Sequence, residues 1–243
     1  MGKEKLEMNN YIFAQGLCFY KVFCVFVVGS VLGDIIETVF CYLKYKKRLS
    51  RSSFVYGHLS VIWGFAFVIA TVLFYHMKSA GFISVFLVGT VLGGAYEYLC
   101  SFMAEKCLGV KFWDYSKFAH NLSGRINLEY CFGWGAATTI WIKCIFPILE
   151  KGIEGIPFVA GTILCNIMLV LLCIDALISY VAIRRYRIRN DKNYVENEFW
   201  SSFDRRFSNQ RMERIFPHMK ICTDDEMINN FNASELTKQK VSC

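Results

Sequence analysis

The sequence predicts an all-α integral membrane protein with about five transmembrane helices, and three observations lead to this fold class. First, 55% of the 243 residues are hydrophobic, only 19% are charged, and the mean hydropathy is +0.35. Second, five apolar stretches are long enough to cross a bilayer, which takes about 20 residues in a helix. Third, the basic residues cluster between alternate stretches, as they do in membrane proteins.

The five expected spans are residues 19–43, 59–77, 80–103, 128–149 and 157–183. Pro147 and Pro157, two of the three prolines, fall near the ends of expected helices, where proline interrupts a helix least. We therefore expect a transmembrane domain over residues 1–185. A cytoplasmic tail, partly disordered, is expected over residues 186–243.

The placement of basic residues predicts the orientation of these helices. They gather after the first, third and fifth spans, as Lys44, Lys46, Lys47, Arg48 and Arg51, then Lys106, Lys111, Lys117 and Arg125, then Arg184, Arg185, Arg187 and Arg189. The other two loops carry one basic residue each, Lys78 and Lys151. Because basic loops stay on the cytoplasmic side, we expect the N-terminus outside the cell membrane and the C-terminus inside.

A repeated segment indicates an internal duplication. FVVGSVLGDIIET at residues 26–38 aligns with FLVGTVLGGAYEY at residues 86–98. This predicts two helix pairs in the same orientation, the first two spans and then the next two. Each repeat also holds glycines four residues apart, Gly29/Gly33 and Gly89/Gly93. Such glycines let helices approach closely, so we expect the first and third spans to pack on each other or across a dimer.

Five carboxylates are candidates for an intramembrane polar or coupling site. They are Asp34, Glu37, Glu97, Glu105 and Asp175. A carboxylate at membrane depth costs about 2.5–3.5 kcal/mol on insertion scales, so it needs a partner or a function. Asp34 and Glu37 are three residues apart and share a helix face, and Glu97 is the repeat equivalent of Glu37.

Two interpretations of these carboxylates stay open. In the first, they form a polar pathway or coupling site. In the second, Glu37 and Glu97 are structural and pair with Arg51 and Arg125 just beyond the helix ends. The closeness of both glutamates to the cytoplasmic interface favours pairing, whereas the deeper position of Asp34 and Asp175 suits either interpretation.

The two expected cytoplasmic loops carry the most distinctive motifs. The first reads RSSFVYGHLSVIWG over residues 51–64, and the other reads FWDYSKFAHNLSGRINL over residues 112–128. Trp113 and Tyr115 suit a membrane interface, and Asp114 either pairs with Arg125 or caps a local turn. Three interpretations of the second loop stay open. It is expected to be an ordered structural element, a docking surface for a cytoplasmic partner, or a catalytic pocket that faces the inner leaflet.

In these motifs the chain resembles the ABC-transporter type IV (CmpB-like) permease family. The matching residues are Glu37, Arg51, Phe54, Gly57, Ile62, Gly64, Glu97, Trp113, Asp114, Tyr115, Ser116, Asn121, Gly124, Arg125 and Phe216-Pro217. The resemblance extends over nearly the whole chain and implies a transport subunit. His58 and Val61 replace two prolines of the first-loop motif, and Asp34 stands where the family usually has an aromatic or aliphatic residue. A re-entrant turn shaped by those prolines is therefore expected to differ here.

The tail contains a regular row of aromatic residues. Phe199, Phe203 and Phe207 lie four residues apart, beside Arg205 and Arg206. The spacing is typical of a basic amphipathic helix on the inner leaflet. A flexible tail held to anionic lipid by its arginines is the alternative. We expect disorder from about residue 223 onward.

Several common catalytic motifs are missing from the sequence. It contains no G-x-x-x-x-G-K-[ST], no H-E-x-x-H, no G-x-S-x-G and no Cys/His zinc spacing. We therefore expect no catalytic residues, no cofactor, no metal site and no nucleic-acid partner. The eleven cysteines are scattered, and we interpret them as small apolar residues rather than a disulfide framework.

Together these features predict a permease-like transport subunit of unknown substrate that works with a separate ATPase. Five helices are few for a whole translocation path, so a homo-oligomer in the lipid bilayer is expected. A second hypothesis is a membrane-embedded enzyme acting on lipid or a lipid-linked substrate, with the carboxylates and loop residues as acid–base groups. A third is a membrane scaffold that transports nothing.

Overall fold

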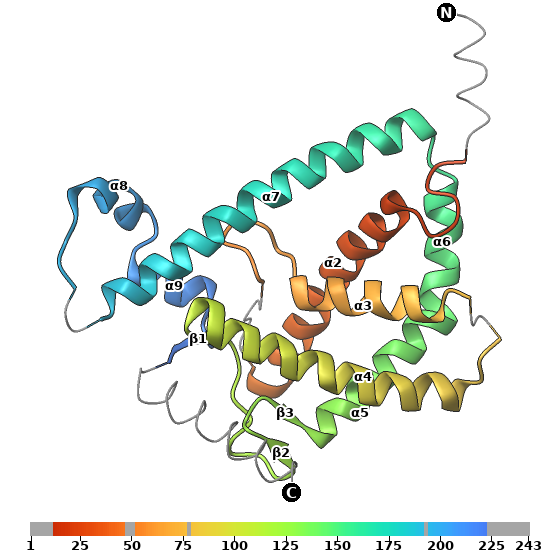
Figure 1. The fold of residues 1–243 in the computed structure, drawn as a ribbon, viewed down its shortest axis with the longest axis horizontal. Coiled ribbons are helices and arrows are strands. Elements are labelled where there is room, and N and C mark those ends of the chain that lie inside the picture. The colour runs from red at the N-terminus through yellow and green to blue at the C-terminus, as the bar shows by residue number, and fades with distance from the viewer. Residues whose placement is uncertain (1–11, 47–51, 77–78, 192–193, 223–243) are drawn as a thin grey trace, which may run out of the picture.

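The computed structural model describes residues 12–46, 52–76, 79–191 and 194–222, and helices make up most of them. In chain order the helices of the bundle are α2 (Phe19–Tyr45), α3 (Val61–Phe74), α4 (Phe82–Met103), α5 (Leu128–Ile140), α6 (Phe146–Glu154) and α7 (Phe158–Arg189) (Figure 1). Two π-helical turns continue these helices. The first, η1 (Ala104–Leu108), extends α4, and the second, η2 (Trp141–Ile145), joins α5 to α6.

Four continuous helical segments are long and apolar enough to cross a bilayer. They are Phe19–Leu43, Phe82–Leu108, Leu128–Glu154 and Phe158–Arg189. Large apolar side chains are exposed along them, for example Ile163, Leu171 and Leu177 of α7. Such surfaces suit lipid rather than water. The predicted all-α membrane fold is confirmed, and the chain is a membrane protein.

The second expected span is shorter than predicted. Residues 59–77 were expected to cross the bilayer, but α3 covers only 14 residues, Val61–Phe74. At 1.5 Å per residue this helix is about 21 Å long, less than the hydrocarbon thickness of about 30 Å. Its start is delayed because residues 52–60 fold back on themselves, with Ser53 N donating to Leu59 O at 2.8 Å. Ser60 N then donates to Ser30 O of α2 at 3.0 Å.

The two sequence repeats correspond to two packed helix pairs, α2 with α3 and α4 with α5. The glycine spacing that recurs in the two repeats serves contacts within each pair. Gly33 lies against the side chain of Trp63, and Gly93 lies against that of Trp134. Within the described chain the close neighbours of these glycines come from the next helix of the same repeat, so they do not pack the first span on the third; packing across a dimer stays a prediction.

One apolar core lies where α3 meets the η2 and α6 segment. The rings of Phe67 and Trp141 stack with their centroids 4.2 Å apart, and Trp141 Nε1 donates to Thr71 Oγ1 at 2.8 Å. At the end of the bundle where α2 begins, Lys21 is fully buried and donates to Glu150 and Glu154 of α6. This cluster clamps the start of α2 to the neighbouring helix.

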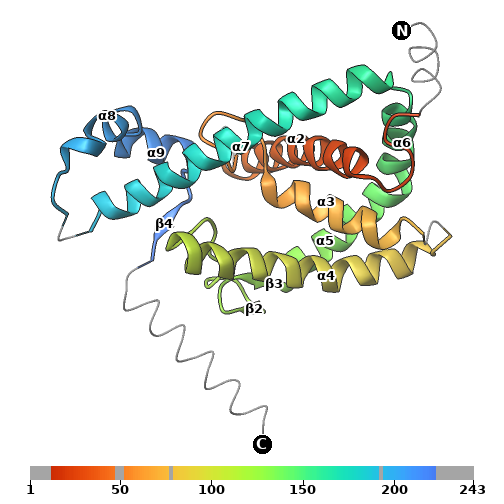
Figure 2. The same ribbon diagram turned by 45° about the horizontal axis from the view of Figure 1, so that its top comes forward.

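The tail folds back onto the opposite end of the bundle. It contains α8 (Glu198–Arg206), α9 (Asn209–Ile215) and β4 (Lys220–Ile221), which pairs antiparallel with β1 (Val110–Lys111) after η1 (Figure 2). The side chains of Phe207, Met212 and Phe216 are buried in a shared core with Ile183 and Tyr186 of α7. A helix, α8, does form over the predicted row of aromatic residues, so a wholly flexible tether is wrong for this part of the tail, and the position of α8 on the leaflet stays a prediction. Residues from 223 onward lie outside the described chain.

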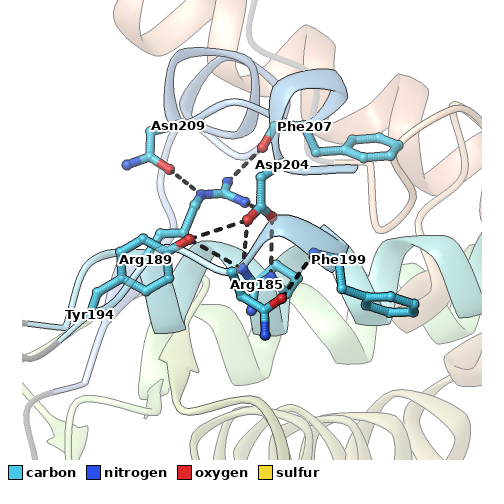
Figure 3. Close-up of polar contacts among 8 residues, drawn as sticks. Arg185, Arg189, Tyr194, Phe199, Asp204, Phe207 and Asn209 are labelled. Carbon is cyan, nitrogen blue, oxygen red and sulfur yellow. Dashed lines mark hydrogen bonds and ion pairs between the residues drawn. The ribbon is translucent and has the colours of Figure 1, made fainter. Parts of the chain in front are cut away.

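Charged contacts fix the tail to the end of α7, which continues six residues beyond its predicted end to Arg189. Figure 3 shows Arg185 and Arg189 both directed at Asp204 of α8. Arg185 Nη2 lies 2.6 Å from Asp204 Oδ2, and Arg189 also donates to Phe207 O at 2.6 Å and to Asn209 Oδ1 at 3.0 Å. Although burial alone raises the pKa of Asp204, hydrogen bonds and charges from the two arginines hold it below its ordinary value.

Candidate functional site

A cavity of about 510 Å³ lies at the end of the bundle that carries the tail. Its wall comes from the loop before α3 and the first turn of α3, the α4 and η1 segment, the start of the next loop, the C-terminal half of α7, and the end of α9 with the residues after it. The lining residues fall within 52–54, 60–62, 100–108, 112–113, 176–183 and 215–219, together with Glu37 of α2. The motifs of the two expected loops therefore converge on one space.

Asp175 and Ser179, one turn apart on α7, hold the first loop in place. Asp175 accepts hydrogen bonds from the backbone N–H of Gly57 at 2.7 Å and of Tyr56 at 3.3 Å. Ser179 Oγ accepts from Val55 N at 2.9 Å. Asp175 is thus satisfied by backbone donors and positions the loop that forms part of the cavity wall.

The first loop is also stabilised from within by Ser52. Its hydroxyl donates to Gly57 O and accepts from Phe54 N at 3.2 Å and Leu59 N at 3.3 Å. A side chain at position 57 would place its Cβ 3.1 Å from the Asp175 carboxylate, a close approach that favours glycine. The turn forms here without the two prolines of the family motif, because serine and aspartate oxygens satisfy its backbone donors.

Glu37 is the one predicted intramembrane carboxylate that lines the described cavity wall. Its Oε1 accepts from Trp63 Nε1 of α3 at 2.7 Å. The Trp63 side chain lies over Gly33, one turn before the glutamate, so a small residue is needed there. Its ring also contacts that of Trp134, with centroids 4.7 Å apart, and this contact joins the two repeats.

Glu97 has the equivalent position in the second repeat but a more enclosed environment. It is 6% exposed and accepts from Trp134 Nε1 at 2.6 Å and from Tyr115 Oη at 2.8 Å. The predicted ion pair of Glu97 with Arg125 is wrong. The reason is geometric: loop residues reach Glu97 through the tyrosine hydroxyl, and the arginine turns toward η1.

Arg125 instead pairs with Glu105 of η1. Its Nη2 lies 2.6 Å from Glu105 Oε2, and both side chains are more than nine-tenths buried. The guanidinium also lies 5.3 Å from the ring centroid of Tyr98, and the carbonyl of Arg125 accepts from Trp113 Nε1 at 2.9 Å. Glu105 and Arg125 therefore hold the second loop against the end of α4 and set the position of Trp113 in the cavity wall.

The second loop is held by local hydrogen bonds and a short hairpin, β2 (Asn121–Leu122) with β3 (Ile126–Asn127). Asp114 was expected either to pair with Arg125 or to cap a local turn, and in the structure it caps the turn. Hydrogen bonds from the Ser116 hydroxyl and backbone N–H hold the pKa of Asp114 below its ordinary value. Gly124, at φ +67°, lies in the left-handed region, and Asn121 Oδ1 accepts from its N–H at 2.9 Å.

Of the predicted site residues that the structure describes, Glu37 and Trp113 line the cavity and the others do not. Asp34 is buried at 8% exposure on α2 and is not among the described lining residues. Arg51, with its expected pairing to Glu37, lies outside the described residues.

Residues 24–180, more than half of the chain, match the family model described as "Putative ABC-transporter type IV". The chain belongs to this family. No curated protein and no solved structure matches it.

The region that matches the ABC-transporter type IV family contains Glu37, both loop motifs and the loop anchors Asp175 and Ser179. It ends at residue 180, so the tail wall of the cavity around Phe216 and Pro217 lies beyond the match. The predicted resemblance over nearly the whole chain thus holds for the membrane helices and their loops.

Sequence reasoning did not select the tryptophans that bind the two glutamates, nor Ser179 and Lys21. One available signal was a W-G pair that recurs at Trp63-Gly64 and Trp134-Gly135. In both pairs the glycine packs against a hydroxyl of the preceding helix, Ser30 or Thr90. Extending the repeat to the second helix of each pair would have found these tryptophans.

Proposed function

We propose that this chain is a permease-like subunit that forms a solute pathway in the cell membrane and works with a separate ATPase. The observation that carries the proposal is the cavity of about 510 Å³, a volume typical of small-molecule sites. The loop motifs shared with the ABC-transporter type IV family form its wall, which supports a role for the cavity in the family's activity.

A separate ATPase is part of the proposal because the sequence contains no phosphate-binding loop of the G-x-x-x-x-G-K-[ST] type. Energy from ATP therefore has to come from another chain. The basic loops and the folded tail are the proposed cytoplasmic side, with the N-terminus outside, because positive loops stay inside. A homo-oligomer is proposed as well, since α7 exposes a long apolar face and the bundle is small.

The test is purification of the full-length tagged chain from its own membranes in a mild detergent. We expect an ATPase subunit to copurify, and ATP hydrolysis to depend on the phosphate-binding lysine of that partner. A Glu37→Gln chain should alter hydrolysis by the complex, whereas Glu129→Gln, an exposed charge outside the described cavity wall, should not. Hydrolysis of ATP by the single chain, or a complex that holds no nucleotide-binding protein, would contradict the proposal.

The second candidate function is an enzyme that acts on lipid or a lipid-linked substrate. One observation favours it: Glu37 and His218 line the same cavity as the hydroxyls of Ser52, Ser60 and Ser179. Acid–base and nucleophilic catalysis use these groups. Turnover of a lipid by the purified chain alone in liposomes, measured by mass spectrometry and lost in His218→Gln, would favour this enzyme over the permease.

A further inference from the structure

Two cysteines from different spans lie side by side in the structure. Cys24 belongs to α2 and Cys165 belongs to α7, 141 residues later in the chain, and their Sγ atoms are 3.6 Å apart. Both are free thiols. In a disulfide the two sulfurs are about 2 Å apart, so this pair needs only a short approach of the side chains to form a bond.

The two thiols differ in their exposure. Cys24 is half-buried, whereas Cys165 is only 6% exposed. A reagent therefore reaches Cys24 first, and the neighbouring Cys165 is placed to attack the product. This order of events is that of thiol–disulfide exchange, in which a mixed disulfide forms first and a second thiol resolves it.

The pair lies near the end of the bundle that is opposite to the cavity. Cys24 comes five residues after the start of α2, about 7.5 Å along its axis, and Cys165 comes seven residues after the start of α7. In the proposed orientation this end faces the outside of the cell, where disulfides form and persist. This setting of the pair rests on the proposed function, because the orientation is part of it.

A covalent link at this place would act on the span with the least support. Of the four long helical segments in the described chain, α7 has the smallest buried share. Its C-terminal end is tied to the tail by Arg185 and Arg189, whereas its N-terminal half packs on α2 through an apolar cluster that includes Cys165 and Leu169. A bridge that closes so long a loop constrains the unfolded chain and stabilises the folded one.

We propose that Cys24 and Cys165 are an oxidisable pair that forms a disulfide bridge between α2 and α7. The oxidant is a low-molecular-mass disulfide. Cys24 Sγ bonds to one half of the oxidant and releases the other half as a thiol, and Cys165 Sγ then displaces the first half. The two cysteines thus lose two electrons and two protons, and the oxidant leaves as two thiols.

The test uses dithiodipyridine, an apolar disulfide, and the purified full-length chain in maltoside micelles. The reaction is stopped with acid, and unreduced peptides are identified by mass spectrometry. We expect the peptide of Cys24 to be joined to that of Cys165. Cys144 and Cys173, which are exposed on η2 and α7, should carry thiopyridyl groups, because an exposed thiol stops at the first step unless a second thiol lies within reach.

Serine variants separate the two steps. In Cys165→Ser the bridge should be lost and Cys24 should keep a stable thiopyridyl group, since no thiol remains to resolve it. Cys173→Ser, in the same helix, is the matched control and should form the bridge as the unchanged chain does. If Cys165→Ser fails to fold, Cys165→Ala takes its place, because alanine is an apolar residue that fits a buried site.

Three results would overturn the pair. One is an unchanged chain in which Cys24 carries a stable thiopyridyl group while Cys165 stays a thiol. Another is a bridge from Cys24 to a different cysteine. The third is a folded chain in which neither cysteine reacts, although both react after unfolding.

Thermal unfolding gives a second readout of the bridge. The bridged chain should have a midpoint about 5 °C or more above that of Cys165→Ser treated in the same way. Dithiothreitol should remove the difference. Equal midpoints for the two oxidised chains would overturn the role of the bridge as a link that stabilises α7.

The outcome is separable from that of the proposed function, because the reaction in micelles does not depend on orientation. A chain that forms the bridge but copurifies with no ATPase would keep the pair and reject the permease, and an ATPase on a chain that forms no bridge would do the reverse. In cells trapped with acid and then alkylated, we expect the bridge to be present. A bridge in micelles with free thiols in cells would keep the pair and contradict the proposed orientation.

Discussion

Glu37 and Glu97 show how equivalent residues of a repeat acquire different roles. Each accepts a hydrogen bond from a tryptophan of the following helix. Glu97 also accepts from the Tyr115 hydroxyl and is buried, whereas Glu37 is half-buried and lines the cavity. The burial of Glu97 and its two hydrogen-bond donors support the interpretation of Glu97 as a structural residue, although Arg125 is not its partner.

Replacing Glu97 with glutamine is expected to lower the free energy of unfolding by about 1.5–3 kcal/mol. Glutamine offers one acceptor oxygen, whereas the carboxylate uses two, so either Tyr115 or Trp134 loses its acceptor. Thermal unfolding in micelles measures the effect, with Glu129→Gln as the matched surface control. A stability that returns when Arg125 is also neutralised would contradict the hydrogen bonds described here and support a Glu97–Arg125 pair.

The attachment of the tail is expected to depend on pH through Asp204. Because its pKa is depressed in the folded chain, the stabilisation is fully present above the ordinary pKa, about 3.9. It is lost as the pH falls through the lower folded-state value. Hydrogen–deuterium exchange of residues 198–215, corrected for intrinsic pH effects, should show protection that is constant from pH 8 to 5 and declines below about pH 4.

Asp204→Asn is the control for this pH dependence. It removes the charge that Arg185 and Arg189 share, so the tail should be less protected at neutral pH and its protection should vary little over the same range. A tail whose protection declines equally in both chains would show that another group is responsible.

At the scale of helices, each repeat is a pair held by close contacts between a glycine on one helix and an aromatic or hydroxyl side chain on the next. The first helix of each pair supplies the glycine and the glutamate one turn later. The second helix supplies a tryptophan that covers the glycine and binds the glutamate. This arrangement orients Trp63 and Trp134 so that their rings meet between the repeats.

Gly93→Ala tests this packing, and Gly133→Ala is the matched control. A Cβ at position 93 would collide with the Trp134 side chain, whereas one at position 133 meets no atom within 4 Å. We expect Gly93→Ala to destabilise the chain by about 1–3 kcal/mol through overpacking. Gly133→Ala should be neutral or stabilising, since alanine favours a helix. Equal midpoints of thermal unfolding for the two variants would contradict the packing.

The whole molecule has two different ends. At one end, Lys21 with Glu150 and Glu154 ties α2 to α6. At the other, the loops, α7 and the tail enclose the cavity. The charge pattern predicts that the cavity end faces the cytoplasm, and the short α3 is the one helix of the second expected span that has to cross the membrane for this orientation to hold.

We expect alkaline phosphatase fused after Lys78 to be active, and a fluorescent protein fused at the C-terminus of the full chain to be fluorescent inside the cell. The basic residues of the first loop and the tail should retain those segments in the cytoplasm. An inactive fusion after Lys78, with the C-terminal fusion still fluorescent, would show that α3 does not cross the membrane. The reverse pattern at both sites would overturn the proposed orientation.

Much of the fold follows from local sequence. Apolar length predicts four of the five expected spans, and the repeated glycine and glutamate spacing predicts the duplication. The second span is too long in the prediction because residues 59 and 60 are apolar or small, yet their backbone groups bond to the first loop and to α2. Hydropathy describes only how apolar a segment is, so it does not show that hydrogen bonds to the first loop and to α2 replace helical ones at these two residues.

The sequence by itself determined the membrane class, the helix order and the repeat, because these depend on composition and periodicity along the chain. Only the tertiary structure decided the partners. Arg125 binds Glu105 and not Glu97, Asp175 holds a loop more than a hundred residues earlier, and Phe207 and Phe216 of the tail pack on α7. Each choice depends on which groups the packed helices bring within hydrogen-bond distance, and spacing along one helix does not contain that information.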